Sequence, residues 1–164
     1  MKKAGKKEIL QRLINIFSKY ENVSTLVKEE AEVLFGPDDD KCLLLQYVKK
    51  ILEKEKETKI SQIRKFFGHI RNLEVAWMDK PAKKGIDKSD LAELRKFMVF
   101  IRYAIGRGYL DPTLKDFFSA LLQRVHTYED FRYFVDIFEA LVAYYVYLSS
   151  IKEEKKRRKP VRAR

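Results

Sequence analysis

Apolar residues recur at intervals of three and four along almost the whole chain of 164 residues. Near the start, Ile9, Leu13 and Phe17 repeat at a spacing of four, with Leu10 and Ile14 beside them. This periodicity is typical of amphipathic α-helices, and no segment shows the alternation expected of a convincing strand. The sequence therefore predicts an all-α fold, a single compact helical bundle of about five to six helices with basic, partly disordered termini.

Start and stop signals delimit the periodic segments. The segments cover residues 6–20, 24–35, 40–57, 61–78, 88–105, 111–125 and 128–155. Ser24 is the expected cap of the second segment, and Asp87 with Asp90 resembles a capping box. Thr127 with Asp130 has the same spacing and is expected to start the last helix.

The last segment is apolar nearly all round. Its only polar strip consists of Arg132, Asp136, Glu139 and Ala143. A helix of this kind is normally the central member of a bundle or part of an oligomer interface. Its uncharged run from Ala140 is twelve residues long, which is too short to span a bilayer. We therefore expect a soluble, cytoplasmic protein.

Positive charge is concentrated in three places. The net charge is +11, of which a basic N-terminal tail (1–7) carries +4 and a basic C-terminal tail (152–164) carries +6. The intervening helical-bundle domain (8–151) is nearly neutral, but its middle zone (59–107) carries +7 and is flanked by two zones of −3. A basic balance of this kind indicates a polyanionic partner, nucleic acid first.

The residues offer little support for catalysis or metal binding. The single cysteine, Cys42, excludes a disulfide framework and a cysteine-based zinc site. We expect no cofactor, no metal site and no catalytic residue. The two histidines, His69 and His126, favour surface or helix-end positions, and a ribonuclease that uses them is the weaker alternative.

Paired cations in the middle zone are the stronger functional signal. Arg64 and Arg71 are seven residues apart on one helix with Gly68 between them, and Arg95 and Arg102 repeat this spacing on the next helix. Seven residues span about 10.5 Å of helix. Two such pairs on neighbouring helices could follow a phosphate backbone without reading bases, although a solvated helix face has the same pattern.

Further residues extend this candidate surface. Lys65, Lys96 and Arg107 add charge, Lys83 and Lys84 lie in a loop that is expected to be mobile, and Tyr103 and Tyr109 could stack on bases. The candidate RNA-binding residues are Arg64, Lys65, Arg71, Arg95, Lys96, Arg102 and Arg107.

Three stretches resemble a known family in their order and spacing. They are SQIRKFFGHI (61–70), FIRYAIGR (100–107) and FVDIFEALVAYYVYL (134–148). Together they are similar to the small subunit of type III-A CRISPR–Cas effector complexes, the Csm complexes, over roughly residues 58–150. Arg64, Lys65, Arg71, Arg102 and Arg107 lie in or beside these stretches, whereas Arg95 and Lys96 rest on helix geometry alone.

The resemblance implies a non-catalytic all-α subunit that acts in antiviral defence. Several copies would stack along the complex beside the backbone subunits and the large subunit. They would contact the guide RNA and the single-stranded target RNA through phosphates, independently of sequence. The small subunit of type III-B complexes, and a helical scaffold or adaptor whose basic tails only solubilise it, are the alternatives. A homodimer of the isolated protein is also left open.

Overall fold

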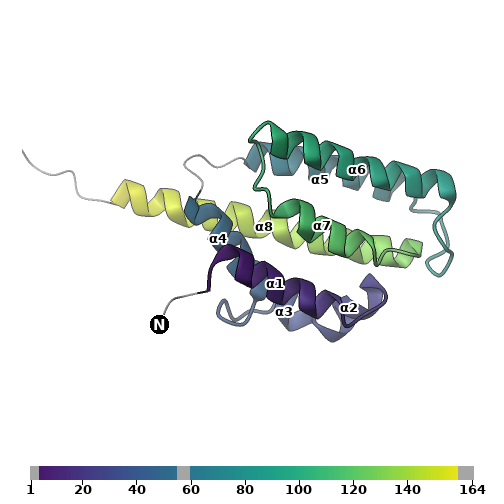
Figure 1. Cartoon of the computed structure of the whole chain (residues 1–164), viewed down its shortest axis with the longest axis horizontal. Coiled ribbons are helices and arrows are strands. Elements are labelled where there is room, and N and C mark those ends of the chain that lie inside the picture. Colours follow the sequence, from purple (N-terminus) through teal and green to yellow (C-terminus); the bar gives the residue numbers. More distant parts are fainter. Residues whose placement is uncertain (1–3, 55–59, 159–164) are drawn as a thin grey trace, which may run out of the picture.

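Eight α-helices make up the structure, a computed structural model that describes residues 4–54 and 60–158 (Figure 1). They are α1 (Lys6–Phe17), α2 (Val23–Glu29), α3 (Ala31–Phe35), α4 (Leu43–Lys54), α5 (Ile60–Ala76), α6 (Lys88–Gly106), α7 (Leu114–Leu122) and α8 (Tyr128–Arg158). Within those two ranges there is no strand, only a single β-bridge between Gly85 and Thr127. The all-α prediction is confirmed, but the expected five to six helices were too few.

One of the additional helices arises from a break that the periodicity does not reveal. The segment 24–35 divides at Glu30, whose φ of −119° and ψ of 31° are not helical, into α2 and α3. The expected cap Ser24 was also wrong, because Asn22 is the N-cap of α2 and its Oδ1 accepts a hydrogen bond from the Thr25 N–H at 2.9 Å. Asparagine is among the best N-cap residues, so the helix begins one residue earlier than expected.

Helix α8 is the centre of the bundle, as its apolar character predicted. In Figure 1, α5 and α6 lie on one side of α7 and α8, and α1 to α4 lie on the other. Asp136, Glu139 and Ala143 remain exposed along one strip of α8. By length and composition alone α8 could also cross a membrane, since its most apolar window has a mean hydropathy of 1.4, but core helices of soluble proteins pass the same test.

Aromatic rings connect α5 and α6 to the central helices α7 and α8. The Phe97 ring of α6 meets Phe118 of α7 at 5.1 Å and Phe138 of α8 at 5.7 Å between centroids. On α5, Phe66 lies 6.2 Å from Phe97, and Phe67 lies 5.3 Å from Phe138. Because these distances are typical of favourable aromatic pairs, the rings fix α5 and α6 against α8.

The loop between α5 and α6, which was expected to be mobile, is bonded to the start of α8. The N–H groups of Tyr128 and Glu129 donate to the carbonyls of Lys84 and Ala82 at 3.1 and 2.8 Å. The Lys83 ammonium also forms an ion pair with the Glu129 carboxylate. The first turn of α8 therefore satisfies its free N–H groups with the loop, which the local sequence of the loop could not reveal.

Asp87 has a different role from the expected cap. It precedes α6, but its side chain makes no capping hydrogen bond there. Instead its carboxylate accepts from Lys80, Lys84 and the Tyr128 hydroxyl, and these donors lower its pKa to about 2. These donors lie in the loop between α5 and α6 and on α8. They therefore hold the Asp87 carboxylate away from the N–H groups at the start of α6.

The N-terminal helix begins inside the segment that was expected to be a tail. Lys6 is the first residue of α1, and its ammonium forms an ion pair with the buried Asp111 carboxylate. The same carboxylate accepts from the backbone and hydroxyl of Thr113, whose oxygen lies 2.7 Å from the Tyr47 hydroxyl. Of the predicted tails 1–7 and 152–164, residues 1–3 and 159–164 lie outside the described residues, and α8 continues to Arg158.

Replacing Lys6 with Met tests this buried polar cluster. Met keeps an apolar stem but leaves the Asp111 carboxylate without its cation. Losing one partner of a buried pair costs about 3–5 kcal/mol, and we expect roughly 2 kcal/mol here because Thr113 still donates to the carboxylate. The matched control is Lys7→Met, which removes an exposed charge from the same turn. Equal urea midpoints for the two variants would contradict the assigned role of Lys6.

Candidate nucleic-acid interface

All seven candidate cations lie at the surface of α5, of α6 or of the turn that follows α6. Their side chains belong to exposed residues in every case. Gly68 is exposed between Arg64 and Arg71, and a Cβ built on it would meet no atom within 4 Å. Nothing in the described chain requires glycine at this position.

The two arginine pairs do not face one another. Helix α5 turns Gln62, Phe66 and His69 toward α6, and Arg64 lies roughly 160° around the helix from Gln62. On α6, Phe100 and Ala104 face α5, and Arg102 lies roughly 160° from Ala104. The pairs therefore occupy opposite flanks of the α5–α6 hairpin. From the sequence alone, the two pairs could follow one phosphate backbone side by side on neighbouring helices.

Four of the seven cations have no hydrogen-bond or ion-pair partner within residues 4–54 and 60–158. Arg64, Lys65, Arg95 and Arg102 make no hydrogen bond or ion pair with any described residue. We call them the free cations. A polyanion can approach them without first displacing a carboxylate.

The other three cations are engaged, but only by surface contacts. Arg71 donates to Glu74 at 2.7 Å and lies over the Phe67 ring, and Lys96 forms an ion pair with Glu93 at 3.2 Å. Arg107 bonds the Tyr109 hydroxyl at 3.4 Å with its guanidinium over that ring. Exposed ion pairs of this kind contribute at most about 1 kcal/mol, so phosphate can compete for the Arg71 and Lys96 side chains.

An acidic strip bounds this basic surface on the side of α8. Asp136 and Glu139 are exposed on α8, next to Arg71 and Glu74. Burial, and then the charges of Glu139 and Glu74, raise the pKa of Asp136 above its ordinary value. A phosphate chain would be repelled by this strip, so the favourable surface is the outer side of α5 and α6.

A groove runs between α5 and α6, and Lys65 is the free cation that lines it. It has a volume of about 560 Å³. Its walls consist of Gln62, Lys65, Phe66, His69, Phe100, Tyr103, Ala104 and Tyr109. The sequence singled out Tyr103 and Tyr109 as possible stacking residues but missed Phe100 and His69, because both positions border the apolar stripes and resemble core residues.

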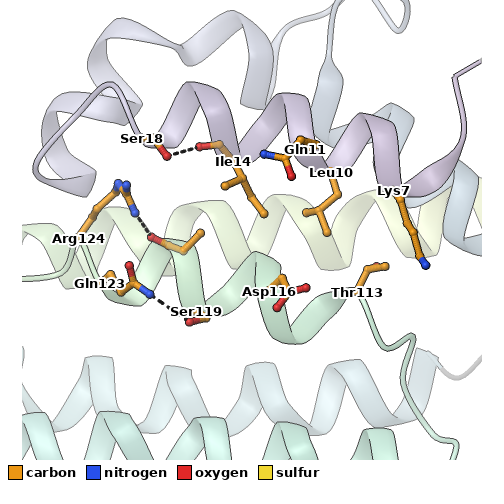
Figure 2. Close-up of a pocket in the computed structure, with 11 residues that line it drawn as sticks. Lys7, Leu10, Gln11, Ile14, Ser18, Thr113, Asp116, Ser119, Gln123 and Arg124 are labelled. Atoms are coloured by element: carbon orange, nitrogen blue, oxygen red, sulfur yellow. Dashed lines mark hydrogen bonds between the residues drawn. The ribbon is translucent and has the colours of Figure 1, made fainter.

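A second hollow lies away from the candidate cations, between α1 and α7 (Figure 2). Leu10 and Ile14 contribute apolar side chains to it, and Arg124 at one end is already bonded to the carbonyls of Phe17 and Ala120 at 2.7 and 2.6 Å. Its remaining lining is polar and of mixed charge, including Lys7. It therefore lacks the concentrated positive charge of the α5–α6 surface.

The two histidines lie in different surroundings. The His69 ring meets the edge of Phe100 at 6.0 Å between centroids, within the groove. The Nε2 of His126 lies 3.0 Å from the backbone carbonyl of Glu21. Among the described residues there is also no cluster of three or more side chains that could ligate a metal.

Comparison with known proteins assigns the family. The family described as Csm2 Type III-A matches residues 40–150, which include α4 to α7 and most of α8. Searches of curated proteins and of solved structures found no match. The matched segment contains all three stretches on which the sequence resemblance rests, and it favours type III-A over type III-B. The chain therefore belongs to the Csm2 family, the small subunits of type III-A CRISPR–Cas effector complexes.

Proposed function

We propose that this protein is a non-catalytic RNA-contacting subunit that uses the outer side of α5 and α6 to hold phosphates. The observation that carries the proposal is the set of four free cations, Arg64, Lys65, Arg95 and Arg102, on two neighbouring helices. Cations of this kind bind the backbone of nucleic acids without reading sequence. The acidic strip on α8 leaves this surface as the favourable path for a polyanion.

The placement of the pairs favours a strand that crosses the hairpin. Arg64 and Arg71 line one flank, and Arg95 and Arg102 line the other. A single strand that passes from flank to flank meets both pairs and runs over Lys65 and the groove between the helices. A strand that ran along one helix would meet only one pair.

Family membership supplies the setting. The subunit would pack beside the backbone and large subunits of the complex and beside further copies of itself. The RNA would be the guide and the single-stranded target, in the cytoplasm, as part of antiviral defence. Catalysis would then belong to other subunits, in keeping with the separate surroundings of His69 and His126.

Salt dependence tests the backbone contact. With four phosphates neutralised, the logarithm of the affinity for single-stranded RNA should fall with the logarithm of salt concentration with a slope of about −2.8. The double variant Arg95→Ala/Arg102→Ala should reduce this slope by about 1.4 and weaken binding equally for unrelated sequences. Fluorescence anisotropy over a salt series measures both effects.

A matched control removes the same charge elsewhere. Lys41 and Lys115 are exposed outside α5 and α6, so Lys41→Ala/Lys115→Ala should change the slope little. If this control weakens binding as much as Arg95→Ala/Arg102→Ala, net charge rather than the hairpin binds the RNA. A chain trimmed to residues 4–151, which lacks the whole basic C-terminal tail, should keep the binding, whereas complete loss would favour a scaffold whose tails carry the affinity.

A further inference from the structure

We propose that the groove between α5 and α6 receives one unpaired base of the crossing RNA strand, which stacks on Phe100 and Tyr103. The inference rests on the proposed function, because the strand must first cross the hairpin. It adds a contact with a base to the contacts with phosphates.

Exposed aromatic rings are the first observation. Phe100 is 45% exposed and Tyr103 is 65% exposed, and both line the groove from α6. Phe66 and Tyr109 are more deeply buried behind them. Proteins that bind single strands usually stack bases on aromatic rings that pack against the protein with one face and expose the other face to solvent.

The charge of the groove matches a nucleotide. Lys65 lines it as one of the free cations, and Arg107 lies over the ring of Tyr109, which is a wall residue. None of the wall residues is acidic. An apolar cleft with cations at its edge accommodates a base inside and its phosphate outside, whereas a purely apolar protein segment would leave the cations unused.

An unsatisfied polar atom is the second, independent observation. The Nε2 of His69 is shielded from water and has no hydrogen-bond partner among the described residues, and the His69 and Phe100 rings are nearly perpendicular to each other. Buried polar atoms are nearly always hydrogen-bonded, so an isolated one beside a groove is a position where a ligand can supply the partner. The edge of a base that enters beside Phe100 carries both donors and acceptors.

RNA without bases tests the proposal. The full chain should be titrated against a labelled 12-nucleotide single-stranded RNA and against the same backbone with abasic positions, at one salt concentration. We expect the intact RNA to bind more tightly by roughly 5- to 140-fold, the range for one stacked base. The salt slopes of the two RNAs should be equal because they carry the same phosphates.

Variants of the wall residues assign the effect to the groove. Tyr103→Ala should remove most of the difference between the two RNAs without changing the salt slope, and Tyr103→Phe should keep the difference. Tyr147→Ala is the matched control, since Tyr147 is a 49% exposed tyrosine on α8, away from the groove. Thermal melts are expected to be similar for all three variants because both tyrosines are exposed.

Each outcome has a separate meaning. Equal affinity for intact and abasic RNA, with the salt slope preserved, overturns the base site and leaves the phosphate contacts standing. Absence of salt-dependent binding at the highest soluble protein concentration overturns both. A change of oligomeric mass in light scattering for Tyr103→Ala, with an unchanged difference between the RNAs, assigns the groove to a second copy of the chain and also overturns the proposal.

Discussion

Replacing Phe97 with Ala is expected to lower the free energy of unfolding by about 3–5 kcal/mol. The Phe97 ring is fully buried, and it contacts rings from α5, α7 and α8. Its removal leaves a cavity at the point where the α5–α6 hairpin meets the bundle. For a chain of this size the melting temperature should fall by roughly 6–20 °C, which calorimetry or circular dichroism measures.

The matched control for Phe97 lies on the same helix. Val99 is 59% exposed, so Val99→Ala should change stability by less than about 0.5 kcal/mol. The Phe97 variant should also weaken RNA binding, because the hairpin that carries the free cations is then less firmly held. A stability loss for Phe97→Ala no larger than that for Val99→Ala would contradict the central position of this ring.

Replacing Asp130 with Ala is expected to lower the free energy of unfolding by about 3 kcal/mol. Its buried carboxylate accepts from the backbone N–H groups of Ser24, His126 and Thr127 at 3.0, 3.0 and 3.1 Å. The Thr127 hydroxyl in turn accepts from the Asp130 N–H, which completes the expected box at the start of α8. One side chain thus caps α8 and joins it to α2.

The same carboxylate predicts an acid-sensitive fold. Burial tends to raise the pKa of Asp130, but the N–H groups of Ser24, His126 and Thr127 outweigh it and lower the pKa below the ordinary 3.8. A lowered pKa adds stability that is complete above the unfolded value. That stability disappears as the pH falls through 3.8 toward the folded pKa.

Asp136 provides an internal control for this dependence on pH. It lies on the same helix, but its pKa is raised, so its ionised form opposes folding above the unfolded value. Urea unfolding between pH 2.5 and 7 should show a weakened acid dependence for Asp130→Asn. Asp136→Asn should be neutral or slightly stabilising at pH 7. Identical pH profiles for Asp130→Asn and the parent chain would contradict the role of Asp130.

The elements that sequence predicted well are those determined by local spacing. The apolar period placed α1, α6 and α8 to within a few residues, and the spacing of Thr127 and Asp130 correctly marked the start of α8. The break at Glu30 was missed, because the apolar spacing of α2 continues into α3 across a single non-helical residue. Periodicity reports which face of a helix is buried, and it does not register one residue of irregular backbone.

The candidate site was predictable only one helix at a time. Spacing placed Arg64 and Arg71 on one exposed strip of α5, and Arg95 and Arg102 on one strip of α6. The two pairs point away from each other because of the faces with which α5 and α6 meet. The contact between Phe66 and Phe97 fixes those faces. Similarly, Lys6 resembled a tail residue because its partner Asp111 is 105 positions away.

The position of α8 has a consequence for biosynthesis. The helices α2, α3, α4 and α5 all pack on α8, and the rings of α6 and α7 reach it as well. Since translation proceeds from the N-terminus, the shared partner of these helices is made last. The apolar faces that these helices bury against α8 stay exposed until residues 128–158 have left the ribosome. We therefore expect aggregation and chaperone binding to be greatest during that interval of synthesis.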